Sequence, residues 1–220
     1  MNTKRNGPNI ANSELLDTYY KFISEKLVEK FPMGYLKETD TGVFIPSSLN
    51  IIRKAFTYLI AKGVIDQNKP LLDAGCGDGR IVALASSMGI SAWGIESDEE
   101  LTALAKHNLI NLRAMRVIGE SQAIIHHGDF CDSKTYKKLD MEFSDFGTVY
   151  NYYNNAGSLA NKIVREAKPR TIFILYSGDE VKEKFCGLIL LHELNLVNDS
   201  NSTLVNLEVP QGFVRVYVKE

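Results

Sequence analysis

Three glycines alternate with other residues directly after an acidic residue, in the stretch Leu71-Leu72-Asp73-Ala74-Gly75-Cys76-Gly77-Asp78-Gly79-Arg80. The apolar run that ends at Asp73 is typical of a strand buried on both faces, and residues 80–88 have a helical pattern. Glycines allow a tight turn with positive φ and let a ligand approach the bare backbone. The stretch therefore predicts a strand, a glycine turn and a helix, which together form the nucleotide-binding corner of an α/β sheet.

The register of the glycines excludes the dinucleotide fingerprint G-x-G-x-x-G. Counted from Gly75 and Gly77, the third glycine of that fingerprint falls at position 80, where this chain has Arg80. The acid two residues before the first glycine is also unlike that fingerprint. Instead, D-x-G-x-G resembles motif I of the class I S-adenosylmethionine (SAM)-dependent methyltransferases. This resemblance implies that Asp73 and the glycine turn lie close to the methionine part of SAM.

Further candidate residues stand at the ends of the next strands. Glu96 lies 96 − 75 = 21 residues after Gly75, the spacing at which an acid accepts hydrogen bonds from ribose hydroxyls. At the third strand end, Gly128-Asp129-Phe130 offers a carboxylate for the adenine amino group and an aromatic ring for the base. At the fourth, Tyr150-Asn151-Tyr152-Tyr153 takes the position beside the reactive methyl. Because ligands bind at the carboxyl ends of parallel strands, we expect these groups to meet.

Each candidate also has a structural interpretation. Asp73 could cap a helix, Glu96 could be a surface acid, and Gly-Asp is a common turn pair. Tyr152 and Tyr153 could be core aromatics, although we expect at least one of them to line the substrate pocket. The small Cys76 fits inside a glycine turn, and we do not expect it to be a nucleophile. No metal site is expected either, since neighbouring residues such as His126 and His127 point to opposite faces of a strand.

The elements that position these residues alternate between strand and helix after an N-terminal helical segment. We expect helices over residues 13–31, 48–62, 80–88, 98–115, 133–139 and 158–167, and strands ending at Asp73 and spanning 91–96, 123–127, 146–150 and 170–176. β-like runs at 188–197 and 203–218 form a closing hairpin. This order predicts an α/β fold, a Rossmann-like seven-stranded sheet with helices on both faces and a C-terminal antiparallel hairpin, as in class I methyltransferases.

The N-terminal region is expected to be an appendage to that sheet. Asn12 or Ser13 can cap its helix, whose apolar face would comprise Leu15, Leu16, Tyr19, Phe22, Ile23, Leu27 and Phe31. Residues 37–46 are rich in turn formers and lead into the second helix. We therefore divide the chain into a tail and helical extension, residues 1–47, and a SAM-binding domain, residues 48–220.

Composition limits the other possibilities. The 220-residue chain has a formal net charge of −2, which gives no general attraction to nucleic acid. Cys76, Cys131 and Cys186 are odd in number and far apart, which indicates free thiols in a reducing compartment. The sequence has neither an apolar run of about 20 residues, as a transmembrane helix requires, nor a secretory signal. We expect a cytoplasmic protein, and the sequence does not indicate its oligomeric state.

A narrower resemblance concerns the methyl acceptor. Gly42-Val-Phe-Ile-Pro-Ser-Ser48, LLDAGCGDGRIV, WGIE and a fourth strand without Asn/Asp-Pro-Pro-Tyr look like a small group of protein-lysine methyltransferases. The group occurs in archaea and in the mitochondrial inner membrane, where its members act on the ATP synthase c subunit and the adenine nucleotide translocase. The similarity covers residues 42–177, and it implies that Phe44, Ile45, Pro46 and Ser47 line the SAM pocket. The tyrosine-rich segment 150–153 departs from the apolar segment of that group.

Together these comparisons assign a role to each candidate residue. The cofactor contacts are expected from Phe44, Pro46, Ser47, Asp73, Gly75, Cys76, Gly77, Asp78, Gly79, Glu96, Ser97, Gly128, Asp129, Phe130 and Asn151, and the catalytic side from Asn151, Tyr152 and Tyr153. The expected reaction is methyl transfer from SAM to a protein lysine. A small molecule or RNA as acceptor, or a SAM-binding protein without transferase activity, remain as alternatives.

Overall fold

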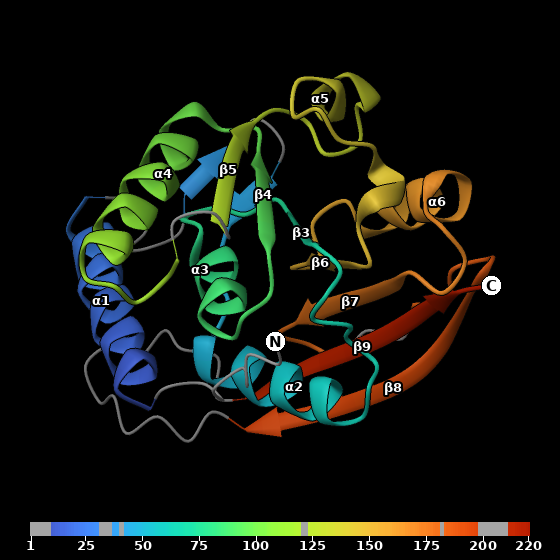
Figure 1. Ribbon diagram of the computed structural model, residues 1–220, viewed down its shortest axis with the longest axis horizontal. Helices are drawn as coiled ribbons and strands as arrows, with labels where there is room; N and C mark the ends of the chain where they lie inside the picture. The colour runs from blue at the N-terminus through green and yellow to red at the C-terminus, as the bar shows by residue number, and fades with distance from the viewer. Residues whose placement is uncertain (1–9, 31–36, 40–41, 120–122, 181–182, 198–210) are drawn as a thin grey trace, which may run out of the picture.

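The computed structural model describes residues 10–30, 37–39, 42–119, 123–180, 183–197 and 211–220 (Figure 1). The helices are α1 (Ile10–Lys30), α2 (Leu49–Ala61), α3 (Arg80–Ser87), α4 (Glu99–Ala114), α5 (Ser133–Lys137) and α6 (Ala156–Glu166), with a 3₁₀ turn at Phe143–Asp145. The strands are β1 (Lys37–Thr39), β2 (Gly42–Phe44), β3 (Leu71–Ala74), β4 (Ala92–Glu96), β5 (Ala123–His127), β6 (Thr148–Asn151), β7 (Ile172–Ser177), β8 (Leu188–Val197) and β9 (Gln211–Lys219).

One seven-stranded sheet organises the molecule, in the order β5-β4-β3-β6-β7-β9-β8. Strands β3 to β7 are parallel, and β9 runs antiparallel between β7 and β8. The predicted α/β fold with its closing antiparallel hairpin is therefore confirmed. The chain adds β4 and β5 on one side of β3 and then crosses back to place β6 on the other side, so the strand order reverses at β3. In open α/β sheets, ligands bind at this reversal, outside the carboxyl ends of the strands.

Helices cover both faces of the sheet because successive strand residues point to opposite sides. Helices α1, α2, α3 and α4 lie together along the sheet (Figure 1). On one face of the sheet Leu71, Ile172 and Ile174 pack with buried residues of these helices. Leu72 and Phe173 pack with α5 and α6 on the other. Strands buried on both faces explain the uninterrupted apolar run before Asp73.

Helix α1 differs from the sequence prediction in its start and in its buried face. It begins at Ile10, so neither Asn12 nor Ser13 caps it. A stripe at positions 16, 20, 23 and 27 is buried, whereas Leu15 and Phe22 are 42% and 52% exposed, so their predicted packing is wrong. These two residues lie to one side of the stripe that a 3.6-residue period places against α3 and α4. Phe31 lies outside the described residues.

Residues 37–46 also differ from the expected turn-rich approach. They contain a short antiparallel hairpin, in which Lys37 pairs with Phe44 and Thr39 with Gly42. The following helix α2 starts as predicted, because the Ser48 side chain accepts a hydrogen bond from the Ile51 amide. The extended segment between Phe44 and Ser48 carries Pro46, which disfavours helix in the residue before it.

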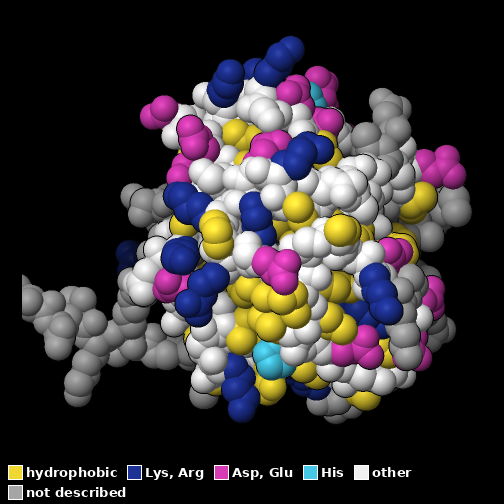
Figure 2. Space-filling model, turned by 90° about the vertical axis from the view of Figure 1, so that its right-hand side faces the viewer, with side chains coloured by type: hydrophobic (Ala, Val, Ile, Leu, Met, Phe, Trp, Pro, Cys, Tyr) yellow, Lys and Arg dark blue, Asp and Glu magenta, His cyan; other side chains and the backbone are white. Residues whose placement is uncertain are grey.

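The outer strand β8 exposes apolar side chains. Ile189, Leu190 and Leu191 are each 43–48% exposed. Figure 2 shows hydrophobic side chains gathered between charged ones on the face at the right-hand side of Figure 1. The register between β8 and β9 shifts between Leu190 and His192. Such an irregularity twists an edge strand and discourages pairing with a further strand.

Among the described helices, none combines the length and the apolar character that a membrane-spanning helix needs.

Candidate functional site

The glycine turn joins β3 to α3 in the conformation that its sequence predicts. Gly75, Gly77 and Gly79 have φ angles of +82°, +52° and +80°, which side chains with a Cβ rarely adopt. The amides of Gly75 and Cys76 donate hydrogen bonds to the Ile95 carbonyl, at 2.9 and 3.1 Å. The turn is thereby fixed to the end of β4, and Gly75 presents bare backbone at the carboxyl edge of the sheet.

Two buried acceptors lack hydrogen-bond donors at the centre of this edge. Asp73 Oδ2 and Asn151 Oδ1 have no partner among the described residues. Asp73 belongs to β3 and Asn151 to the neighbouring parallel strand β6. The Asn151 side chain is oriented by its Nδ2, which donates a hydrogen bond to the Ala74 carbonyl at 2.7 Å. Burial raises the pKa of the Asp73 carboxyl well above its usual range, and the charges of Glu96 and Asp78 raise it further. A ligand at this edge that carries N–H donors or positive charge would satisfy either acceptor.

Glu96 holds the glycine turn to the start of α4. Its Oε2 accepts a hydrogen bond from the Gly77 amide at 2.9 Å, and its Oε1 accepts one from the Asp98 amide at 2.9 Å. Ser97 Oγ lies 3.5 Å from the same Oε1. A carboxylate has about four lone-pair positions, so these contacts leave acceptor capacity for hydroxyl groups of a ligand.

Asp78 was expected among the cofactor contacts, but its carboxylate is fully buried against Arg80. Arg80 Nε lies 3.0 Å from Asp78 Oδ1 and Nη2 lies 2.7 Å from Oδ2. Arg80 also donates to the Ser47 carbonyl and to Ser24 Oγ, and its guanidinium stacks on the Tyr20 ring. The pair thus ties the turn to α1 and to the segment before α2. In the sequence, the only indication of this ion pair is that Asp78 and Arg80 are two positions apart.

The end of β5 contributes groups of different accessibility. Asp129 is exposed, and its Oδ1 accepts a hydrogen bond from the Cys131 amide at 2.7 Å. Phe130 is buried, with its ring 3.7 Å from the position that a Cβ on Gly75 would occupy. Gly128 fits against the Thr135 side chain, where a Cβ would lie 2.7 Å from Thr135 Cγ2. Asp129 can therefore reach a ligand, whereas the buried Phe130 ring packs beside Gly75 of the glycine turn.

The segment after β6 contains two strained residues. Tyr153 and Asn155 have φ angles of +48° and +55°, and a positive φ is rare for a bulky side chain. Tyr153 is 38% exposed and its hydroxyl donates to Glu183 Oε1 at 2.8 Å. This hydrogen bond raises the pKa of Tyr153. No sequence pattern singled out Glu183. Backbone strain of this kind concentrates at functional sites.

The other two tyrosines of this stretch face inward. Tyr152 is half-buried with its ring 4.7 Å from that of Tyr176, centroid to centroid. Tyr150 is buried, and its hydroxyl lies 2.8 Å from Ser47 Oγ. Ser47 and Tyr150 thus join the segment before α2 to the end of β6, and the half-buried Tyr152 ring packs on the buried Tyr176 ring.

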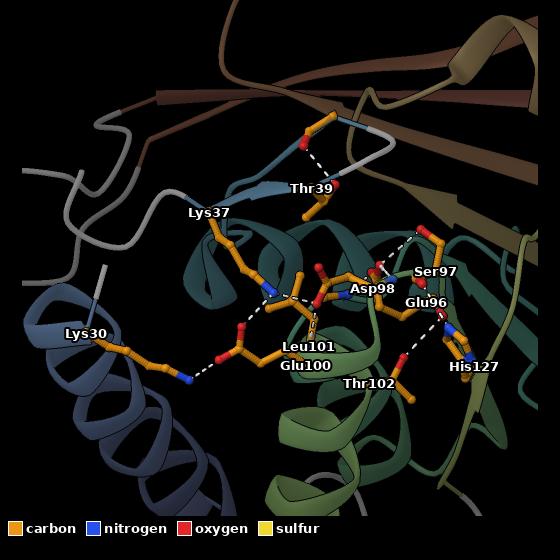
Figure 3. A network of polar contacts seen from close by, with 12 residues as sticks. Lys30, Lys37, Thr39, Glu96, Ser97, Asp98, Glu100, Leu101, Thr102 and His127 are labelled. Carbon is orange, nitrogen blue, oxygen red and sulfur yellow. Dashed lines mark hydrogen bonds and ion pairs between the residues drawn. The ribbon is translucent and has the colours of Figure 1, made fainter. Parts of the chain in front are cut away.

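The β1–β2 hairpin lies over both halves of this edge. A Cβ placed on Gly77 would overlap the Phe44 ring, which shows that the ring packs directly on the glycine turn. A Cβ on Gly42 would lie 3.0 Å from Asn154 Nδ2, in the strained segment after β6. Lys37, which the sequence analysis missed, anchors the hairpin through Asp98 and Glu100 at the start of α4 (Figure 3).

The cysteines and histidines form no metal cluster within the described residues, where no three His, Cys, Asp or Glu side chains come together. Burial raises the pKa of the Cys76 thiol well above its usual range, and the nearby carboxylates raise it further. The thiol is therefore protonated at neutral pH. Gly94 leaves room for it, because a Cβ there would lie 2.7 Å from Cys76 Sγ.

Comparisons with known proteins identify the fold. No family model and no curated protein sequence matches the chain. Magnesium protoporphyrin IX methyltransferase from Synechocystis, solved with bound SAM, has a TM-score of 0.55 at 12% identity, covering 78% of this chain and 79% of that one. A TehB-like SAM-dependent methyltransferase from Corynebacterium glutamicum has a TM-score of 0.50 at 18% identity, covering 96% and 100%.

A third similar structure concerns the conversion of a disulfide bond into a thioacetal group during echinomycin biosynthesis. Its TM-score is 0.56 at 16% identity, with coverage of 91% of this chain and 92% of that one. At these identities the similarity establishes the architecture: the chain has the Rossmann-like fold of class I SAM-dependent methyltransferases.

Proposed function

We propose that this protein is a SAM-dependent methyltransferase and that its acceptor is the ε-amino group of a protein lysine. The observation that carries the proposal is the pair of buried oxygens without donors, Asp73 Oδ2 and Asn151 Oδ1, beside the glycine turn. Leaving a buried acceptor unpaired costs about 1–3 kcal/mol. The ammonium and sulfonium of SAM supply positive charge and N–H donors, which suit this site.

The remaining contacts follow from what each residue presents at the edge of the sheet. Gly75 offers backbone, Glu96 offers acceptor capacity to ribose hydroxyls, and exposed Asp129 offers a carboxylate to the adenine amino group. Phe44 and the hairpin cover the turn. We assign no cofactor contact to the Asp78 carboxylate, because Arg80 occupies it.

Bound SAM supplies the chemistry as an electrophilic methyl group on a sulfonium. The protein must position the acceptor and exclude water. A lysine has a pKa of about 10.4, so deprotonation at pH 7 costs roughly 4–5 kcal/mol. An apolar ring such as that of half-buried Tyr152, held against buried Tyr176, lowers this cost by desolvating the ammonium. Asn151 Oδ1 can orient the amine, and the Glu183 carboxylate beside Tyr153 attracts a cationic side chain to the opening.

The proposal is tested by incubating the purified protein with methyl-labelled SAM and a cell extract. Label on lysine side chains supports the proposal. Label in RNA or in small molecules overturns the acceptor while keeping the methyltransferase activity. One structural neighbour is named for a small-molecule acceptor, magnesium protoporphyrin IX, so this outcome has a precedent on the fold. Absence of label together with absence of SAM binding overturns the whole proposal.

The catalytic assignments are tested separately with Asn151→Ala and Tyr152→Phe. The first removes the acceptor oxygen Oδ1 together with the Nδ2 that donates to the Ala74 carbonyl, and the second removes a hydroxyl while keeping the ring. We expect Asn151→Ala to lower kcat by about tenfold or more, the loss of one oriented hydrogen bond. If both variants turn over like the wild type, neither side chain has the assigned role. Lys26→Met on α1, which removes an exposed ion pair with Glu29, is the matched control.

A further inference from the structure

The β1–β2 hairpin, residues 37–39 and 42–44, is here termed the cover hairpin. It contacts the glycine turn through Phe44 and the strained segment after β6 through Gly42. These two contacts lie on the cofactor side and the acceptor side of the proposed site. The inference rests on that proposed function, because it concerns how the cofactor is retained.

Little apolar burial holds the cover hairpin in place. Phe44 is half-buried against the core, whereas Val43 is 47% exposed. Two paired three-residue strands are not stable on their own in water. The position of the hairpin must therefore depend on its other attachments.

Lys37 provides the strongest of these attachments. Its Nζ lies 2.5 Å from Asp98 Oδ1 and 2.9 Å from Glu100 Oε2, and its side chain is only 14% exposed. Lys30 of α1 also pairs with Glu100 (Figure 3). Hydrogen bonds to both lysines lower the pKa of Glu100 to about 2, so the carboxylate is charged at neutral pH.

The partners of Lys37 belong to the segment that carries Glu96. Asp98 caps α4 through the Leu101 amide, and its own amide donates to Glu96 Oε1. Glu96 Oε2 in turn accepts a hydrogen bond from the Gly77 amide, and Phe44 packs on Gly77. The contacts thus form a closed ring from the cover hairpin through α4 and the glycine turn back to the hairpin.

We propose that Lys37 is a positioning residue that clamps the cover hairpin over the cofactor and thereby sets the rate of cofactor release. SAM and its product S-adenosylhomocysteine (SAH) can leave only when Phe44 lifts from the glycine turn. Lifting breaks the contacts of Lys37 with Asp98 and Glu100. Because the Glu100 side chain is 49% exposed, added salt weakens its ion pair with Lys37: the screening length falls from about 8 Å at 0.15 M to about 3 Å at 1 M.

The test measures release of radiolabelled SAH after a chase with unlabelled SAH, at low and high salt. Lys37→Met keeps the length of the side chain and removes its charge. We expect release from this variant to be about tenfold faster than from the wild type, the loss of one charged hydrogen bond. We also expect salt to accelerate release from the wild type but not from Lys37→Met. Lys37→Arg, which restores the charge, should restore most of the slow release.

Two controls separate the clamp from general stability. Lys26→Met removes an ion pair of α1 that touches neither α4 nor the cover hairpin, and it should release SAH like the wild type. Should Lys37→Met fail to fold, Glu100→Gln decides, since it removes one partner and leaves Asp98 as the cap. It should accelerate release in the same direction by a smaller factor.

Unchanged release from the folded Lys37→Met protein, or from Glu100→Gln where that variant decides, overturns the clamp and leaves the proposed function intact. Failure of the wild type to bind SAH overturns the proposed function itself, and the clamp with it. The two failures are therefore distinguishable in one set of measurements.

Discussion

At the residue scale, Asp73 shows how a binding site can oppose stability. Its carboxyl is buried without a donor on Oδ2, and burial raises its pKa well above the usual value. A raised folded-state pKa favours folding at low pH, and this stability is lost as pH rises through the folded pKa. At neutral pH the native protein therefore bears the cost of a buried charge or of a proton that it must retain.

Asp73→Asn should remove that cost and weaken binding. We expect the free energy of unfolding at pH 7 to rise by about 1–3 kcal/mol, with a gain of about 2–4 °C in Tm per kcal/mol. The gain should shrink as pH falls towards 4, where the unfolded carboxyl is also protonated. SAH affinity should fall at the same time. Thermal denaturation across this pH range and calorimetric titration with SAH check both parts, and a lower Tm at pH 7 would contradict the interpretation.

At the element scale, the ends of helices decide small stability differences. Two residues after the last residue of helix α4, Arg116 has a φ of +58°, and the Val117 amide donates a hydrogen bond to the Leu112 carbonyl at 2.9 Å. This is the Schellman arrangement, in which glycine is the preferred residue at the left-handed position. Arg116 is exposed and has no contact with the proposed site.

Arg116→Gly should therefore stabilise the protein. Relief of the left-handed strain is worth roughly 1–2 kcal/mol, and the larger unfolded-state entropy of glycine removes about 0.4–1 kcal/mol of it. We expect a net gain of about 0.5–1 kcal/mol with unchanged SAH affinity. Denaturant unfolding measures the gain. Arg113→Gly, inside the helix, serves as the comparison and should destabilise.

The Asp78–Arg80 pair connects three elements and should be sensitive to the loss of one partner. Both side chains are buried, and Arg80 reaches Ser47 and Ser24. Arg80→Met leaves the Asp78 charge without its partner, which costs about 3–5 kcal/mol. Adding Asp78→Asn to this variant should recover part of the loss. Chemical denaturation of the two variants measures the difference, and equal stability of both would show that the charge of Asp78 is compensated elsewhere.

At the scale of the whole molecule, α1 shares the main core with the sheet. Leu16, Tyr20, Ile23 and Leu27 are buried with residues of α2, α3 and α4. The division of the chain at residue 47 stays a prediction. Because α1 shares this core, we expect residues 48–220 to depend on α1 for their stability.

Deletion of residues 1–30 should prevent stable folding. Each of the four buried side chains contributes about 1.5–3 kcal/mol on burial. Their sum of about 6–12 kcal/mol is comparable to the total stability of a typical domain, about 5–15 kcal/mol. Circular dichroism and thermal unfolding of the truncated chain check this. Cooperative unfolding within a few degrees of the full chain would show that residues 1–30 are an independent extension.

The sequence by itself determined the α/β fold and predicted where the candidate site lies on it. The glycine register, the spacing of 21 residues from Gly75 to Glu96 and the order of strands and helices can all be read along the chain without knowing how the elements pack. Once the strands are parallel, their carboxyl ends must share one edge, so Asn151 and Asp129 follow.

Only the tertiary structure decided which partners these residues have. Lys37 and Asp98 are 61 positions apart, Ser47 and Tyr150 are 103 apart, and Arg80 reaches Ser24 across 56. No periodicity encodes such pairs, because they depend on how whole elements pack. For the same reason the predicted burial of Leu15 and Phe22 was wrong, and the sequence revealed neither the Asp78–Arg80 pair nor the cover hairpin, whose short strands gain their position from contacts with the folded edge.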